Sequence, residues 1–452
     1  MYLSKLLKDT VRLDLFKLNF SFSNEEAGYL YIDDTAKPSA KIMVRIFSFI
    51  LKFIYSLFSI NLNCLKKLKG LETLFFVSSK NQFDAIKIVS NLCKNYEIIG
   101  MFGFGKVQIP LFFIYLSTLF FFPLVLYNYF KSDGYKKESF RYSFDAYWLI
   151  YGIYLISRIV LKYIKPNIIV FLNDHSYENL TVHKAAKDEG VITIFIEHAS
   201  VTETLKLPTL VFDYAFLEGL NSLIKYDSYG ASDTKVFLVG QAKFDEYLKF
   251  RNTSSRVSKI GICVSSLADY KIATELCVAL KNNLPQIQLI LRPHPADPRI
   301  NKWFKMHEKL RINFSNSKEE SSYEFLQKVD AIISGDSNII LESVLLNVYP
   351  IRYAFSNELT DYYGFIKSGL VNNTYKNSED LIKFLYKLIN IKPIIQNNIK
   401  IYCDTIGTKY EGKSTLIILE LISSLIKKEN IVDEKKWVRL KEVSNLEAYR
   451  LY

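Results

Sequence analysis

Cysteine is scarce in this chain, and the few cysteines present are widely scattered. The 452 residues include five cysteines, and no two of them have the close spacing of a zinc site or a redox motif. They are Cys64, Cys93, Cys263, Cys277 and Cys403. This pattern is typical of free thiols in a reducing compartment. The first nine residues carry Lys5, Lys8 and Asp9 with no apolar core after them, so we expect no secretory signal and a cytoplasmic protein.

Familiar catalytic motifs are also missing. The chain contains no H-E-x-x-H zinc motif and no G-x-S-x-G nucleophile elbow. The net charge of +12 predicts an anionic partner, and nucleic acid, a membrane face and a pool of nucleotide-sugars all fit that charge. Because no nucleic-acid-binding motif accompanies the basic residues, we do not expect nucleic acid to be the partner. Nothing in the sequence requires a metal ion or another cofactor.

The apolar segments, in contrast, are regular and numerous. Apolar residues make up 49% of the chain and charged residues 23%, which indicates a packed globular protein. Short apolar segments alternate with helical ones, as in parallel sheets that are covered on both faces. The expected strands are residues 74–77, 97–102, 167–172, 191–196, 212–216, 235–240, 260–264, 287–291, 331–333 and 349–353.

The length of the chain predicts two domains, because one hydrophobic core rarely serves so many residues. Residues 250–258 are polar and lack large apolar side chains after Phe250, so we expect the linker there. We therefore predict an α/β protein with two Rossmann-like domains facing across a cleft, residues 1–250 and 251–452. Residues 1–70 are expected to form a helix-rich extension, and residues 414–428 a last helix followed by a charged tail.

Two segments of the N-terminal half predict contact with a membrane. Residues 107–130 carry no charge and approach the ~20 residues that cross a bilayer, although Pro110 and Pro123 interrupt them. They fit a buried helix, a helix that dips into one leaflet, or a span, and a buried or peripheral helix is favoured over a span. Residues 41–53 are basic and amphipathic, as an interfacial helix would be; the alternative is a core-facing helix with solvated lysines. We expect peripheral association with the anionic inner face of the cell membrane.

In the second half, two strand-like segments end at polar groups suited to binding phosphate. Arg292-Pro293-His294-Pro295 follows the expected strand 287–291, and offers a guanidinium and an imidazole in a loop stiffened by proline. Ser334, Ser337 and Asn338 follow the strand 331–333 at an expected helix N-terminus, where backbone N–H groups favour an anion. These three residues are equally suited to capping that helix. Glu342, one turn further on, could accept hydrogen bonds from ribose hydroxyls.

The first half also has polar residues where strands end. Asp174 follows the strand 167–172, and Glu197 and His198 follow the strand 191–196. Because the carboxyl ends of parallel strands meet at one edge of a sheet, we expect these residues to lie near one another. Asp174 or Glu197 could take a proton from an acceptor hydroxyl, and His198 could bind the acceptor. The alternative for Asp174 and His175 is that they only end the strand and cap the next helix.

Taken together, these residues resemble the GT-B glycosyltransferases that build bacterial capsules and O-antigens. The resemblance covers about residues 165–370, and it includes Val239–Asp245 and Asp361–Phe365 beside the motifs above. The His-Pro pair is similar to the motif with which transferases of CMP-activated acidic sugars, such as Kdo and sialic-acid-like sugars, hold the CMP phosphate. It implies that His294 binds phosphate, with Ser334 and Ser337 assisting, and that Glu342 holds the ribose. Where relatives often have Gln-His-Gly, this chain departs with Glu197-His198-Ala199.

The resemblance implies a glycosyltransferase that moves a CMP-activated ulosonic acid onto a surface polysaccharide or a lipid-linked glycan. Related patterns occur in CDP-glycerol or CDP-ribitol phosphotransferases and in UDP-sugar 2-epimerases, which are the enzymatic alternatives. A non-catalytic membrane scaffold for other polysaccharide enzymes is the third alternative.

Overall fold

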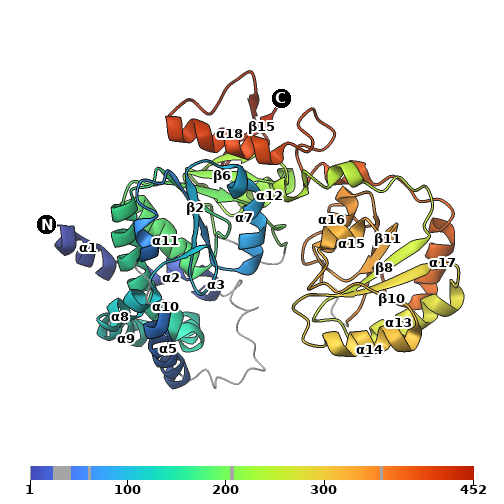
Figure 1. Ribbon diagram of the computed structural model, residues 1–452, viewed down its shortest axis with the longest axis horizontal. Helices are drawn as coiled ribbons and strands as arrows, with labels where there is room; N and C mark the ends of the chain where they lie inside the picture. The colour runs from blue at the N-terminus through green and yellow to red at the C-terminus, as the bar shows by residue number, and fades with distance from the viewer. Residues whose placement is uncertain (1, 24–41, 60–62, 204–207, 357–359) are drawn as a thin grey trace. The chain divides into compact units, whose positions relative to one another are not determined.

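The computed structural model describes residues 2–23, 42–59, 63–203, 208–356 and 360–452, which form two compact units (Figure 1). Unit 1 comprises Met1–His198, Leu205–Ala242 and Thr415–Tyr452, and unit 2 comprises Ala199–Thr204 and Lys243–Ser414. Each unit has its own sheet of mainly parallel strands. The predicted α/β class with two such units is therefore confirmed.

The sheet of unit 1 has nine strands, in the order β14-β15-β7-β6-β5-β4-β1-β2-β3, and only β14 and β15 pair antiparallel. Its strands are β1 (Thr73–Val77), β2 (Tyr96–Gly100), β3 (Val107–Gln108), β4 (Ile168–Phe171), β5 (Ile192–Ile196), β6 (Tyr214–Leu217), β7 (Lys235–Leu238), β14 (Trp437–Arg439) and β15 (Glu447–Leu451). Every residue of β1 and β4 is buried. Burial on both faces explains why these strands read as continuous apolar segments.

Helix α10 (Gly134–Ile164) is the central helix of unit 1. It is long and apolar enough to cross a membrane, but 83% of its most apolar window is buried within the unit, as in a core helix. Two shorter helices, α8 (Leu111–Leu119) and α9 (Phe122–Lys131), are bent by 63° at the break between them. A Cβ on Gly152 of α10 would lie 2.0 Å from Thr118 Oγ1, so α8 and α10 pack in close contact. The charge-free residues 107–130 therefore form a short strand and most of two helices that meet at a bend.

The N-terminal residues are helical, as predicted. They form α1 (Tyr2–Val11), α2 (Leu15–Leu18), α3 (Phe20–Ser23), α5 (Ile42–Ser56), the 3₁₀ helix η1 (Leu57–Ser59) and α6 (Asn63–Lys66). Lys41, the first residue of the expected interfacial helix, lies outside the described residues. The helices α7 (Lys80–Leu92), α11 (Tyr177–Asp188) and α12 (Leu220–Ser228) connect strands of the sheet.

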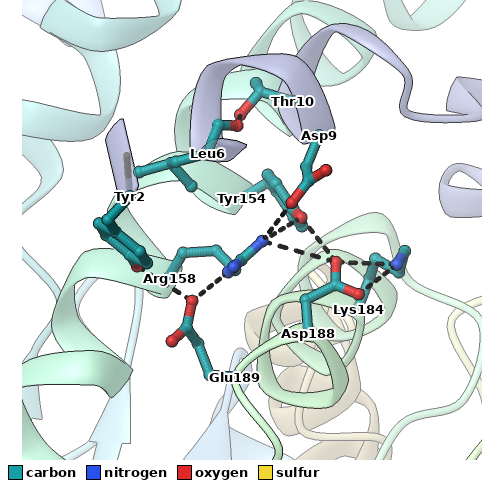
Figure 2. A network of polar contacts seen from close by, with 9 residues as sticks. All are labelled: Tyr2, Leu6, Asp9, Thr10, Tyr154, Arg158, Lys184, Asp188 and Glu189. Carbon is teal, nitrogen blue, oxygen red and sulfur yellow. Dashed lines mark hydrogen bonds and ion pairs between the residues drawn. The ribbon is translucent and has the colours of Figure 1, made fainter. Parts of the chain in front are cut away.

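A buried arginine attaches α1 to the rest of unit 1 (Figure 2). Arg158 of α10 is only 2% exposed, and its guanidinium forms ion pairs with Asp9 of α1 at 3.2 Å, Asp188 at 3.8 Å and Glu189. Tyr154 accepts a further hydrogen bond from it at 2.7 Å. Because three carboxylates surround one guanidinium, the cluster holds α1, α10 and the end of α11 together.

The sheet of unit 2 has six parallel strands in the order β10-β9-β8-β11-β12-β13. They are β8 (Lys259–Val264), β9 (Gln288–Pro293), β10 (Asn313–Phe314), β11 (Ala331–Ser334), β12 (Tyr349–Tyr353) and β13 (Thr374–Tyr375). Its helices are α13 (Tyr270–Asn283), α14 (Ile300–Leu310), α15 (Ser322–Leu326), α16 (Ile339–Leu345) and α17 (Ser378–Leu388), with 3₁₀ helices η2 (Ala242–Phe244), η3 (Leu248–Phe250) and η4 (Gln396–Ile399). Neighbouring residues of a strand enter different apolar clusters, Ile333 in one and Ile332 in the other, because side chains alternate between the faces of a sheet.

The observed units differ from the predicted domains in two respects. The first boundary falls at Ala242, several residues before the expected 250, and the segment Thr415–Tyr452 belongs to unit 1. Helix α18 (Ser414–Lys427) has the predicted bounds to within one residue. The expected charged tail after it instead contains β14 and β15, and β15 pairs in parallel with β7. This pairing places the C-terminal residues in the first sheet.

Candidate functional site

The predicted phosphate-binding residues of unit 2 lie where neighbouring strands end together. A row of residues in register crosses β9, β8, β11 and β12: Arg292, Cys263, Ser334 and Arg352. His294 follows this row on one strand, and Asp336 follows it on another. The sheet thus brings the two predicted motifs to one carboxyl edge, with β8 between them.

Arg292 itself lies beneath this edge. It is 6% exposed, and it donates to Ser315 Oγ at 2.6 Å and to the backbone oxygen of Glu320 at 2.8 Å. Its guanidinium also lies 5.0 Å from the centre of the Phe325 ring. Burial lowers the pKa of Arg292. These contacts make Arg292 a support for the loops of the edge, whereas the sequence had predicted a group that faces phosphate.

His294 is exposed at the same edge. Its Nδ1 accepts a hydrogen bond from the backbone N–H of Ala296 at 3.2 Å. Partial burial lowers the pKa of His294; the charge of Asp297 opposes this and that of Arg292 adds to it, and the net effect favours the neutral ring. With Nδ1 acting as an acceptor, the proton of the neutral ring is on Nε2. His294 therefore presents an N–H donor at the edge, as a phosphate-binding residue must.

The loop after His294 is held by a buried carboxylate. Asp297 accepts hydrogen bonds from the backbone N–H of Arg299 at 2.8 Å and from Trp303 Nε1 at 2.9 Å. Burial alone would raise the pKa of Asp297, but these donors and the charge of Arg299 outweigh it and lower the pKa to about 2. Arg299 also donates to the backbone oxygen of Ala268 at 2.8 Å, which ties this loop to the one after β8. The imidazole is thus carried by a fixed loop.

The end of β11 and the loop between it and α16 have buried polar atoms without partners. Ser334 Oγ, Asp336 Oδ1 and Asn338 Oδ1 are buried, and none has a hydrogen-bond partner among the described residues. Asn338 is the N-cap residue of α16, yet its side chain makes no capping bond, so the capping alternative is not observed. Ser337, half-buried in the same loop, lies between them. These atoms therefore have unused hydrogen-bonding capacity at the end of the strand.

Asp336 is a site residue that the sequence analysis did not select. Its Oδ2 accepts hydrogen bonds from Arg352 at 3.0 Å and from the backbone N–H of Tyr362, which leaves Oδ1 unbonded. Burial raises the pKa of Asp336, and the charge of Arg352 partly offsets this. The signal for Asp336 was its place two residues after a strand. Arg352 was not selected because it lies within an apolar strand and not after its end.

Glu342 lies on the first turn of α16, as the sequence predicted. It is half-buried, and its Oε1 is 3.8 Å from Lys243 Nζ. That distance allows a weak ion pair, so the carboxylate keeps the capacity to accept hydrogen bonds from a ligand.

In unit 1, Asp174 forms a hydrogen-bonded group with its neighbour. Its Oδ1 is 2.8 Å from His175 Nδ1, and its Oδ2 accepts a hydrogen bond from Tyr226 at 2.6 Å. Burial would raise the pKa of Asp174, but the hydrogen bond and charge of His175 outweigh it, and the pKa is lowered. Burial would lower the pKa of His175, but Asp174 outweighs it in turn, and that pKa is raised. Both oxygens of Asp174 are engaged, whereas the His175 side chain is 30% exposed.

Glu197 lies beside this group and is buried, at 6% exposure. It accepts hydrogen bonds from the backbone N–H of Glu218 at 2.7 Å and from Ser222 Oγ. Burial raises the pKa of Glu197 to about 7, to which the charge of Asp174 adds. The carboxylate therefore anchors the ends of β5 and β6 from inside the unit. His198, the next residue, is half-buried where β5 ends.

No group of three or more histidine, cysteine, aspartate or glutamate residues suited to a metal ion occurs in the described part of the chain. The sequence of residues 407–414 matches the phosphate-loop pattern G-x-x-x-x-G-K-[ST], with Gly407, Gly412, Lys413 and Ser414 at the specified positions. The structure does not give this segment the required context, because no strand precedes it. Instead, Glu411 accepts a hydrogen bond from the backbone N–H of Gly407 at 2.6 Å and forms an ion pair with Arg251. The backbone N–H that would bind phosphate in a phosphate loop is therefore already bonded to a carboxylate.

No protein-family model matches the chain, and no curated protein matches its sequence significantly. Solved structures do match. UDP-GlcNAc 2-epimerase from Neisseria meningitidis, bound to UDP-GlcNAc, is 14% identical; the match covers 78% of this chain and 100% of the epimerase, with a TM-score of 0.50. Another UDP-N-acetylglucosamine 2-epimerase is 11% identical, with 81% and 98% covered and a TM-score of 0.50. The wall teichoic acid polymerase TagF is 15% identical, with 85% and 98% covered and a TM-score of 0.48. At these identities the likeness shows the fold alone: the chain has the GT-B fold.

Proposed function

We propose that this chain is a glycosyltransferase that moves a sugar from a nucleotide-sugar to a bacterial surface polysaccharide or a lipid-linked glycan. The observation that supports it best is the edge of unit 2, where Ser334, Asp336 and Asn338 have buried oxygens without partners. Buried polar groups nearly always have partners, so a cluster of unpaired ones favours a polar ligand at that place. His294 is exposed at the same edge.

These groups match the parts of a nucleotide. The Nε2–H of His294 and the hydroxyls of Ser334 and Ser337 can donate hydrogen bonds to phosphate oxygens. Asp336 Oδ1, Asn338 Oδ1 and the carboxylate of Glu342 can accept hydrogen bonds from ribose hydroxyls. Donors and acceptors are thus available for both halves of the ligand.

A CMP-activated ulosonic acid is the donor that we prefer, because of the resemblance of the His294-Pro295 pair to the motif of such transferases. The likeness to epimerases in fold does not decide the donor. A CDP-glycerol or CDP-ribitol phosphotransferase, a UDP-sugar 2-epimerase and a non-catalytic membrane scaffold remain the alternatives.

The reaction also needs a base in unit 1. As the acceptor oxygen bonds to the anomeric carbon, the bond from that carbon to the phosphate oxygen breaks, and the nucleotide leaves with the electron pair. The acceptor proton must go to a side chain. We assign it to His175, whose imidazole is partly exposed, and make Asp174 the positioning residue that orients the ring. Glu197 supports the strand ends from within, and His198 would contact the acceptor.

The test is release of free nucleotide from CMP-Kdo and CMP-sialic acid, with and without a glycan acceptor. The proposal predicts CMP release that depends on the acceptor. Conversion of UDP-GlcNAc without any acceptor would identify an epimerase instead, and glycerol phosphate transfer from CDP-glycerol would identify a phosphotransferase. Absence of turnover together with absence of nucleotide binding would favour the scaffold.

We propose that the reaction takes place in the cytoplasm, at the inner face of the cell membrane, where the enzyme would meet a lipid-linked acceptor. The net charge of +12 favours attraction to an anionic leaflet.

A further inference from the structure

The outward face of helix α5 is apolar along its whole length. Its exposed apolar side chains recur every three or four residues, which places them on one side of a helix. They are Met43, Val44, Phe47, Ile50, Leu51, Ile54 and Tyr55, continued by Leu57 and Phe58 of η1. Met43, Tyr55 and Phe58 are 74%, 76% and 86% exposed. Water-soluble surfaces seldom keep large apolar side chains in an unbroken row, so this face is suited to an apolar partner.

The basic residues of α5 do not share that face. Arg45 and Lys52 lie on the flank that faces α10, 3.9 Å and 3.5 Å from the carboxylate of Asp145. Phe49, between them in sequence, is fully buried and stacks on Trp148 at 4.0 Å. The helix therefore faces the core with one side, and the Lys52 side chain is 53% exposed, as the core-facing alternative predicted. The interfacial alternative is compatible with this arrangement, because the opposite, apolar side carries no charge.

The bent pair α8–α9 adds apolar surface near α5. Figure 1 shows α5, α8 and α9 gathered at the same end of unit 1, and the rings of Phe53 and Phe112 stack at 5.9 Å. Phe120, at the bend, is 78% exposed, and Phe130, near the end of α9, is 72% exposed. The exposed apolar surface is therefore formed by three helices.

The charge of the residues around this surface favours an anionic lipid leaflet over a second copy of the chain. Residues 35–71 and 98–132 contain no aspartate or glutamate, but they carry a series of basic residues. These are Lys37, Lys41, Arg45, Lys52, Lys66, Lys67, Lys69, Lys106 and Lys131. An anionic lipid leaflet offers both an apolar interior and negative headgroups to such segments. A second copy of the chain would bring like charges together.

We propose that α5, η1 and α8–α9 form a docking surface that inserts into one leaflet of an anionic bilayer without crossing it. Helix α5 has 15 residues, fewer than the ~20 that a span needs, and its inner side is packed against α10. The bend of 63° keeps α8 and α9 from forming one straight span. The inference rests on the proposed membrane location, but not on the proposed reaction.

The test is co-sedimentation of the full chain with vesicles of phosphatidylcholine containing phosphatidylglycerol, and with vesicles of phosphatidylcholine alone. The wild type should bind the anionic vesicles more strongly, and the difference should shrink from about 0.1 M to about 1 M salt. The variant Phe47→Glu/Ile54→Glu should lose roughly tenfold or more of its partitioning, because it places two charges in the apolar face.

The matched control is Ile391→Glu/Ile394→Glu, which changes two apolar residues of unit 2 that are each 77% exposed. It should bind vesicles as the wild type does. Cooperative unfolding in urea, measured on each variant, shows that the chain is folded. Nucleotide binding, measured separately on the wild type, tests the proposed function, so failure of the one proposal is distinguished from failure of the other. Equal vesicle binding by both variants would overturn the proposal. So would a lipid-free dimer of the wild type that becomes monomeric in Phe47→Glu/Ile54→Glu, because a second copy would then cover the face.

Discussion

Two groups of buried polar side chains in this molecule differ in what they bond to. In unit 1, the guanidinium of Arg158 is surrounded by three carboxylates and a tyrosine hydroxyl, so the charges satisfy one another (Figure 2). In unit 2, oxygens of Ser334, Asp336 and Asn338 are buried without any partner among the described residues. The first group joins helices, and the second lies where strands end.

This difference in bonding indicates different roles: the first group stabilises the packing of helices, and the second is suited to binding a ligand. A buried charge is costly without its partners, so a buried charge whose partners all lie in the chain fixes one packing of the helices that carry them. A buried polar atom without a partner costs stability, and three such atoms within five residues at the end of a strand favour a polar ligand there. Substitutions in the two groups should therefore separate stability from nucleotide binding.

The largest effect is expected for Arg158→Met. It leaves Asp9 and Glu189 without their cation, whereas Asp188 keeps Lys184 at 2.6 Å, so unfolding in urea should show a loss of about 3 kcal/mol. The nucleotide affinity of the folded protein should stay unchanged, since Arg158 is in unit 1. Lys383→Met, which breaks an exposed ion pair with Glu379, should leave stability almost unchanged. Equal effects of the two substitutions would contradict the structural role of the Arg158 cluster.

Asp174→Asn tests the base in unit 1. Without the carboxylate, the pKa of His175 should fall from its raised value, so the acidic limb of the turnover profile should move to lower pH. Turnover should fall by about a hundredfold because the imidazole loses its orienting partner, while KM for the nucleotide donor changes little. Tyr226→Phe keeps the carboxylate and should have a much smaller effect. A profile that does not move in Asp174→Asn would argue that His175 is not the base.

Ser334→Ala should separate the stability of the fold from nucleotide binding most clearly. Since Ser334 Oγ has no partner, its removal should leave the ligand-free protein as stable as the wild type, or slightly more stable. Nucleotide affinity should fall by about 0.5–1.5 kcal/mol, measured by isothermal titration. Lower stability with unchanged affinity would show that the hydroxyl serves the fold.

The smallest effect is expected for Glu197→Gln, as a change in the pH dependence of stability. The pKa of Glu197 is raised to about 7 by burial, so the folded state holds a proton that the unfolded state releases above its ordinary pKa near 4.5. Its contribution to stability is therefore complete at low pH and lost as pH rises through 7. Urea unfolding between pH 5 and pH 8 should show a flatter decline in the variant, and an unchanged slope would contradict the raised pKa.

Much of the fold could be predicted from the sequence, because buried parallel strands are continuous apolar segments. The strands β4 and β5, for example, lie where the pattern predicted them. The strands β14 and β15 could not be, since Glu447–Leu451 is mixed in polarity and becomes a strand only by pairing with β7. Such a pairing depends on tertiary structure, which overrides local propensity.

For the candidate site, the sequence predicted where the residues lie in the sheet but not which way their side chains point. Polar residues after strand ends were found, but the direction of each side chain depends on packing that a sequence does not display. Arg292 is buried against Ser315 and Glu320, which lie more than twenty residues away in the chain. The helical stripe of α5 was visible, but which side of it met the core was not.

The most direct test of the central claim is the thermal shift of the purified protein with CMP, CDP, UMP, UDP and GDP, compared between the wild type and His294→Ala. We predict that one nucleotide, CMP by preference, raises Tm of the wild type, and that His294→Ala keeps the same ligand-free Tm but loses most of that shift. Equal shifts in both proteins, or no shift of the wild type with any nucleotide, would contradict a nucleotide site at the edge of unit 2.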